Sequence, residues 1–135
     1  MLVLAACAGP GLEGFETRDI RIGDQTLTVA VADTPSLRQQ GLRGVEALPE
    51  GLDGVLFVFE ETRPAVFGML DTLIPLDIWW FDEEGALVGL TEMRPCPAEP
   101  CPDYASPGSV ARALETPAGE FAFPAGAKLS SGDNP

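Results

Sequence analysis

The chain has 135 residues, which is enough for one domain that can bury a core without metals or cross-links. Its 21 acidic and eight basic residues give a net charge of −13; such a field repels phosphate backbones, so we expect no nucleic-acid partner. The sequence contains no His, which excludes His-dependent catalytic triads and His metal sites.

The N-terminus carries a motif of exported proteins. The string Leu4-Ala5-Ala6-Cys7 resembles a bacterial lipobox, in which a signal peptidase cuts before the Cys and a lipid is attached to its sulfur. We therefore expect residues 1–14 to be a partial lipoprotein signal and tether, with Cys7 as the lipidation site. A complete signal needs a basic segment and a longer apolar run before the Cys, so an ordinary N-terminus with a thiol stays open.

Residues 15–129 are expected to form a single β-rich domain. Alternating apolar and polar residues predict a hairpin of strands at 17–22 and 27–31. A helix of about two turns is predicted over residues 36–40. Its signals are Thr34 as N-cap, Pro35 at the first helical position and Gly41 at the end.

The rest of the domain is predicted as short strands separated by turns. The expected strands are residues 54–59, 65–69, 76–81, 86–93, 110–115 and 120–123. Residues 54–59 are almost continuously apolar, which is typical of a strand buried on both faces. The polar segment at residues 60–64 is expected to form a turn, and residues 130–135 a polar tail. The predicted fold class is mainly β, a sandwich or jelly-roll-like sheet with one short helix.

Cys96 and Cys101 lie in a loop with four prolines, which hold it away from helix. Their spacing allows a disulfide, which contributes roughly 2 kcal/mol in the chain-entropy model. Disulfides persist in oxidising compartments, so this pair and the lipobox both favour the periplasm or cell envelope. A closed thiolate metal site needs four ligands, so we expect no metal; a redox-active pair stays open.

From residue 31 onward the chain resembles a bacterial and archaeal family known only as domain of unknown function 192. The matching motifs are Ala32-Asp33-Thr34-Pro35, Gln40-Gly41-Leu42, Gly54-Val55-Leu56-Phe57-Val58-Phe59, Thr72-Leu73-Ile74-Pro75-Leu76-Asp77-Ile78, Cys96, Cys101-Pro102, Tyr104 and Leu114-Glu115. The resemblance implies a jelly-roll-type β fold and frequent export. It implies no activity, cofactor or catalytic residue.

One segment departs from the family pattern. The family tends to have Phe-Trp-Met-Lys-Asn-Thr where this chain has Phe67-Gly68-Met69-Leu70-Asp71-Thr72, so Gly68, Leu70 and Asp71 replace Trp, Lys and Asn. If this segment binds a ligand, the loss of the indole and the cation should change which ligand it binds.

The segment from Phe67 to Asp77 is the centre of the predicted ligand-binding patch. An aromatic floor with carboxylates at both ends suits a sugar or a cation. Trp79 and Trp80 are adjacent and point to opposite faces, so we expect one in the core and the other against a loop, the helix or a ligand. The patch consists of Arg63, Phe67, Met69, Asp71, Asp77, Trp79, Trp80 and Tyr104. The alternative for both Asp residues is a structural role: Asp71, with Thr72, would accept backbone N–H bonds in the turn, and Asp77 would pair with an Arg.

These features together predict an exported, lipid-anchored domain that binds a small ligand or a cell-envelope partner without catalysis and without a cofactor. The membrane is then a partner through the N-terminal lipid. The alternative is a carboxylate-dependent enzyme on envelope polysaccharide, with Asp71, Asp77 and Glu92 as candidate acids. A third possibility is a structural envelope protein, which would have no pocket.

Overall fold

The computed structural model describes residue 9 and residues 11–132, so Cys7 and the predicted lipobox at residues 4–7 lie outside the described residues. Within them the chain forms seven strands and one helix. The elements are β1 (Glu16–Ile22), β2 (Gln25–Ala32), α1 (Pro35–Gln40), β3 (Gly54–Phe67), β4 (Leu76–Phe81), β5 (Leu87–Met93), β6 (Tyr104–Pro117) and β7 (Leu129–Ser131). The predicted mainly β, single-domain fold with one short helix is confirmed.

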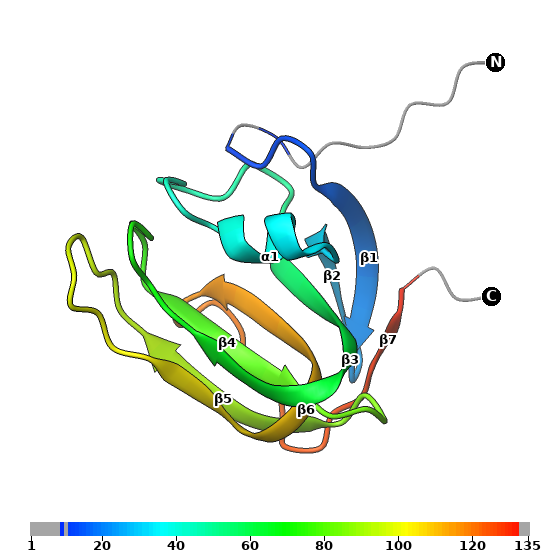
Figure 1. Cartoon of the computed structure of the whole chain (residues 1–135). Coiled ribbons are helices and arrows are strands. Elements are labelled where there is room, and N and C mark those ends of the chain that lie inside the picture. Colours follow the sequence, from blue (N-terminus) through cyan, green and yellow to red (C-terminus); the bar gives the residue numbers. More distant parts are fainter. Residues whose placement is uncertain (1–8, 10, 133–135) are drawn as a thin grey trace, which may run out of the picture.

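All the described strands join one curled sheet, in the order β5-β4-β6-β3-β2-β1-β7 (Figure 1). β2 and β3 run parallel, which requires the crossover that contains α1. β6 is antiparallel to both β3 and β4 and so joins the two halves of the sheet. At one corner the Leu129 amide donates to the Gly85 carbonyl at 2.8 Å, and Ala86 forms an isolated β-bridge with Lys128. The start of β7 therefore meets the turn before β5, which joins the two ends of the sheet.

The helix signals act as the sequence predicts. The Thr34 side chain accepts a hydrogen bond from the Leu37 amide at 3.2 Å, which satisfies one of the exposed donors of the first turn. Gly41 ends the helix with φ 45° and ψ −130°, a conformation that side chains disfavour. α1 therefore begins and ends at fixed points above the sheet.

β3 is one bent strand of 14 residues, where the sequence predicted two strands separated by a turn at residues 60–64. The rings of Phe57 and Phe67 lie 4.8 Å apart, centre to centre. A straight strand would separate residues ten positions apart by about 33 Å. The pairing with β6 shifts register twice, between Val58 and Arg63 and between Pro64 and Val66, and these irregularities bend the strand.

The core has two clusters, one on each face of the sheet. Phe57, Ile78 and Trp80 belong to the cluster beneath α1, and Trp79 and Leu114 to the cluster on the opposite face. The two Trp residues therefore point to opposite faces, as predicted, but both are buried. The Trp80 indole N–H donates to the Thr91 hydroxyl and that of Trp79 to the Thr116 hydroxyl, each at 3.0 Å.

The C-terminal part of the domain differs from the prediction. Residues 120–123 form no strand; Phe121 and Phe123 instead pack against the cluster that contains Trp79. The segment expected to be a tail begins within β7, which pairs with β1. At the other end Leu12, expected in a tether, is fully buried. No helix in the described part of the chain is long and apolar enough to cross a membrane.

Gly54 lies where the backbone of β3 passes very close to that of β6. A Cβ at this position would overlap the carbonyl oxygen of Glu115, which is backbone and has no room to move. We expect Gly54→Ala to lower the free energy of unfolding by about 1–3 kcal/mol, the usual range for overpacking. Gly68→Ala is the matched control because a Cβ there meets nothing within 4 Å. Urea denaturation compares the two, and equal stabilities would contradict the close approach.

Candidate functional site

The bend of β3 encloses a pocket of about 820 Å³ between β3, α1 and the loop that contains Cys101. This volume is within the usual range for small-molecule sites. Residues of α1 and the turn after it form one wall, both arms of β3 form a second wall, and residues 99–103 contribute the third. Glu115 of β6 also lines the pocket.

Glu115 is a buried acid in the middle of the sheet. It pairs with Val55 of β3 and Ile78 of β4, and its exposed fraction is 4%. Its carboxyl group forms no hydrogen bond or ion pair with the described residues. No described side chain has a fully enclosed nitrogen or oxygen atom without a partner, so the Glu115 carboxyl oxygens must reach accessible space. The pocket provides that space.

Burial of Glu115 raises the pKa of its carboxyl group from 4.5 to about 8. The physical cause is desolvation, because a charge loses its hydration in the protein interior and no neighbouring cation compensates for the loss. Glu115 is therefore mainly a neutral acid at pH 7. In that state it can donate one hydrogen bond into the pocket, and as a carboxylate it can accept hydrogen bonds or bind a cation.

Aromatic rings form a continuous surface next to Glu115. Phe57 pairs with Ala113, two residues before Glu115 on β6, so Phe57 and Glu115 are diagonal neighbours on one sheet face. The Phe67 ring meets Phe57 at 4.8 Å, Trp80 at 5.5 Å and Phe59 at 6.3 Å, all in edge-to-face orientations. Phe57, Phe59 and Phe67 all line the pocket.

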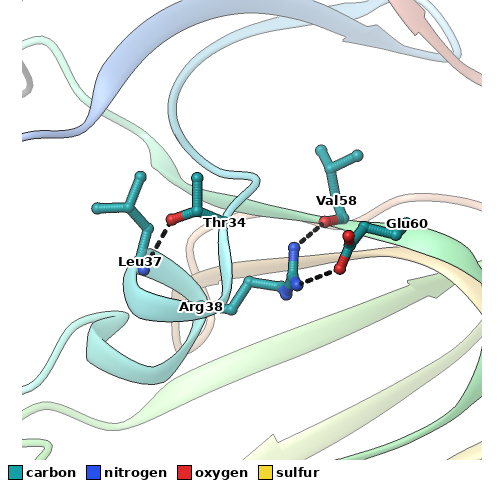
Figure 2. A network of polar contacts seen from close by, with 5 residues as sticks. All are labelled: Thr34, Leu37, Arg38, Val58 and Glu60. Carbon is teal, nitrogen blue, oxygen red and sulfur yellow. Dashed lines mark hydrogen bonds and ion pairs between the residues drawn. The ribbon is translucent and has the colours of Figure 1, made fainter.

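Arg38 fixes the helix wall to β3 (Figure 2). Its Nη1 donates to the Val58 carbonyl at 2.9 Å, and its Nη2 forms an ion pair with Glu60 Oε1 at 3.1 Å. The Arg38 side chain is 10% exposed and that of Glu60 is 75% exposed. The bond to the backbone carbonyl is thus sheltered from water, whereas the ion pair is solvated on the Glu60 side.

The loop wall is tied to the turn that follows β3. The sulfur atoms of Cys96 and Cys101 lie at disulfide distance, 2.03 Å, as the sequence predicted. The Asp71 amide donates to the Cys96 carbonyl at 3.1 Å, and the Gly44 amide donates to the Asp71 carbonyl at 2.9 Å. One chain of backbone hydrogen bonds thus connects the cysteine loop to the turn that follows α1.

Two further arginines line the pocket. The Arg63 guanidinium lies 4.9 Å from the centre of the Phe59 ring, a cation–π arrangement. Arg43 forms an isolated antiparallel β-bridge with Thr72. Neither arginine has an ion-pair partner among the described residues, where Arg38 and Glu60 form the only ion pair. No three His, Cys, Asp or Glu side chains of the described part of the chain gather as a potential metal site.

The structure brings only some of the predicted patch together. Arg63 and Phe67 line the pocket, as do Gly68 and Leu70, which stand where the family pattern has Trp and Lys. Trp80 supports the Phe67 ring from within the core. Met69 is fully buried and does not line the pocket.

The other predicted residues have structural contacts. The Asp77 carboxylate accepts a hydrogen bond from the Gly119 amide at 3.0 Å, so its partner is a backbone amide and not the Arg that the structural alternative expected. Asp71 occupies a turn with φ 61° outside the pocket. The Tyr104 hydroxyl accepts from the Arg94 amide at 3.3 Å, and Trp79 packs against Phe123 at 4.7 Å.

Sequence reasoning missed Glu115 as a site residue. The residue follows Ala113 and Leu114 and precedes Thr116, so the alternation of polar and apolar residues does not single it out. The available signal was an acidic residue within a predicted strand. Its meaning depends on knowing that β6 lies between β4 and β3 in the sheet, which the sequence does not show.

Comparison with known proteins defines the class of this domain. A family model described as DUF192, Uncharacterized ACR, matches residues 18–133, so the chain belongs to that family. A search of curated proteins finds no match.

Two solved structures share the fold. The first is a protein from Sinorhizobium meliloti 1021 with a provisional description as a transcription regulator. It is 28% identical to this chain, has a TM-score of 0.76, and the match covers 87% of this chain and 95% of that chain. A protein of unknown function from Novosphingobium aromaticivorans DSM 12444 is 21% identical, with a TM-score of 0.76 over 93% and 92% of the two chains; at this identity it shows the fold alone.

The contacts of Arg38 predict an asymmetry between its two partners. Arg38→Met leaves the half-buried Val58 carbonyl without its donor, so we expect the free energy of unfolding to fall by about 1–3 kcal/mol. Glu60→Gln removes only the solvated ion pair and should change stability by less than about 1 kcal/mol. Urea denaturation measures both, and equal losses would show that the backbone contact is not the stronger one.

Burial of Glu115 predicts a specific pH dependence of stability. Because the pKa is raised to about 8 in the folded state, the stability contribution of the protonated acid is complete below about pH 4.5 and is lost as the pH rises toward 8. Glu115→Gln has no proton to lose. We therefore expect the variant to gain a few kcal/mol of stability over the parent protein between pH 5 and pH 9, since a tenfold change in a protonation equilibrium corresponds to about 1.4 kcal/mol. Parallel pH–stability curves for the two proteins would contradict this account.

Proposed function

We propose that this protein is an exported, lipid-anchored, non-catalytic domain that binds a small ligand in the pocket above Glu115. The observation that carries the proposal is the buried Glu115 carboxyl group, which has no partner among the described residues and opens into the pocket. A buried polar group without a partner is destabilising unless a ligand or another group uses it. A site for a ligand accounts for its position.

The construction of the walls also supports binding. The pocket is lined by aromatic rings whose positions are fixed by one another, and by a helix that Arg38 ties to β3. Walls that are ordered before the ligand arrives lose little conformational entropy on binding, which favours affinity. An apolar surface with a few fixed polar groups is the usual composition of a small-molecule site.

Export and lipid anchoring rest on the cysteines. The lipobox-like string that ends at Cys7 and the cysteine pair at the pocket wall are both typical of proteins outside the cytoplasm. The pair is also positioned to matter for the pocket, because Cys101 lines it. An oxidising compartment would keep that wall cross-linked.

The alternative, a carboxylate-dependent enzyme on envelope polysaccharide, has weaker support. Such an enzyme needs two acids that face one cleft. Among the described residues, Glu115 is the one buried acid on the pocket wall, since the buried Asp77 lies elsewhere and Glu92 is exposed on β5. Glu60, Glu99 and Asp103 line the pocket as exposed side chains, which does not suit a general acid, so binding is the function that the geometry supports better.

The proposal predicts a co-purifying ligand. Native and denaturing mass spectrometry of the protein, expressed in its own host and taken from the membrane fraction, should give a lipidated Cys7 and a small adduct. The Cys96–Cys101 pair should show a mass deficit of two hydrogens. A reduced, unlipidated protein without an adduct would overturn the proposal.

A pocket-filling variant supplies the control. Gly68 lines the pocket and has open space around the position of a Cβ, so Gly68→Trp should fold and should reduce the adduct strongly. Val88→Trp adds the same side chain at an exposed site on β5, away from the pocket, and should retain the adduct. An adduct that survives in Gly68→Trp would place the ligand elsewhere on the protein.

A further inference from the structure

We propose that the ligand of this pocket is a small organic cation, a protonated amine or a quaternary ammonium. Its charge would pair with the Glu115 carboxylate, beside the aromatic wall formed by Phe57, Phe59 and Phe67. The inference rests on the proposed function, because it names the chemical class of ligand that the same pocket takes.

The first argument is the state of Glu115. An ionised carboxylate is stable in a buried place only when a positive charge or several hydrogen bonds compensate for its lost hydration. None of the described side chains supplies either, although three arginines line the same pocket. A cationic ligand supplies the missing charge, whereas a neutral ligand uses only one hydrogen bond and an anionic ligand would oppose ionisation of Glu115.

The second argument is the chemistry of the aromatic wall. Phe57 is a diagonal neighbour of Glu115, and its ring contacts Phe67. The faces of aromatic rings attract cations, and ammonium ligands are bound in proteins by such groups of rings. Arg63 over the Phe59 ring shows that a cation already lies against this wall.

The third argument is the balance of the other charges around the pocket. Arg38 and Glu60 pair with each other, Arg43 and Arg63 have no acidic partner, and Glu99 and Asp103 have no basic one among the described residues. These three positive and three negative charges offset one another in number, and all of them except Arg38 are exposed and screened by water. The buried group therefore decides the sign of the site, and the net charge of −13 on the whole chain attracts cations toward it.

Proton release distinguishes this ligand class from the others. Because burial holds the pKa of Glu115 near 8, a cation that binds at pH 7 must displace the proton of that carboxyl group. For a group that titrates at about 8, the affinity for a cation should rise on the order of 50-fold between pH 6 and pH 8. A neutral ligand that accepts a hydrogen bond from the acid should bind no better at pH 8 than at pH 6.

The experiment uses matched probes on the full chain. Choline and phenethylamine are the cations, dimethylbutanol and phenethyl alcohol are their neutral counterparts, and dimethylbutanoate is the anion of similar shape. Isothermal titration at pH 6 and pH 8, in buffers that differ in heat of ionisation, gives both the affinity and the protons released. We expect at least one cation to bind at least about tenfold more tightly than its neutral counterpart at pH 8, and to release close to one proton at pH 7.

Variants assign the effect to Glu115. Glu115→Gln should bind the cation as weakly at pH 8 as the parent protein does at pH 6, and it should release no proton. Glu99→Gln removes an exposed carboxylate from the same pocket and is the matched control, which should retain the pH dependence. Thermal unfolding of each variant verifies that it is folded under the conditions of the titration.

The outcomes separate this inference from the proposed function. No saturable binding of either cation, equal binding of cation and neutral probe, or tightest binding of the anion would overturn the cation inference. A neutral or anionic probe that binds the parent protein but not the Gly68→Trp variant would support the pocket as a ligand site. That result would also overturn the inference that the ligand is a cation. Choline-displaceable sedimentation with phosphatidylcholine vesicles supports a lipid headgroup as the source of the cation, and choline binding without sedimentation supports a free solute.

Discussion

The bend of β3 is the constraint on which the rest of the structure depends. Phe57 and Phe67 sit ten positions apart in one strand, yet their rings are in contact. The contact is possible because β6 follows β3 through two register shifts and keeps the backbone of both arms hydrogen-bonded. Without the bend, the Phe residues would face solvent along an extended strand. With it, they close one end of the core and surround a pocket that lies above Glu115.

The pocket is held by contacts that are themselves parts of the fold. α1 is short and contains no buried residue, so its position depends on its caps and on Arg38, which reaches the Val58 carbonyl on β3. On the other side, backbone hydrogen bonds run from the Cys96 carbonyl through Asp71 to Gly44, just after the helix. Each wall is thus bonded to an element far away in sequence. A change in one wall would be transmitted to the others through rigid backbone contacts, which suits a pocket that must keep its shape.

Glu115 is the exception among the buried acids of the described chain, which are Asp77 and Glu115. Asp77 accepts a hydrogen bond from the Gly119 amide, and the buried Thr116 hydroxyl accepts one from the Trp79 indole. Glu115 lowers the stability of the fold at neutral pH, because its ionisation is opposed by burial. Residues that oppose stability in this way are concentrated at functional sites. In the proposed site the same buried carboxyl group would select ligands by charge, because the other charged residues of the pocket are evenly divided in sign.

The sequence by itself determined the local structure: the capped helix at Thr34–Gly41, the β1–β2 and β4–β5 hairpins, the buried start of β3 and the cysteine pair. Each depends on neighbours in the chain, such as an N-cap hydroxyl, a turn, an apolar run or a short loop that two cysteines can close. Phe67, which lines the pocket, was named from the sequence as an aromatic residue of the segment 67–77, and Arg63 was named as a charged residue near that segment. The long-range arrangement was decided only in three dimensions. Whether residues 60–64 form a turn or a bend within one strand depends on their pairing with β6. Both Trp residues are buried because each face of the sheet carries a hydrophobic cluster. Glu115 is buried because β3 and β4 flank its strand on both sides. Burial and charge compensation are properties of what surrounds a residue in space, and the order of strands in a sheet is not written in the spacing of residues along the chain.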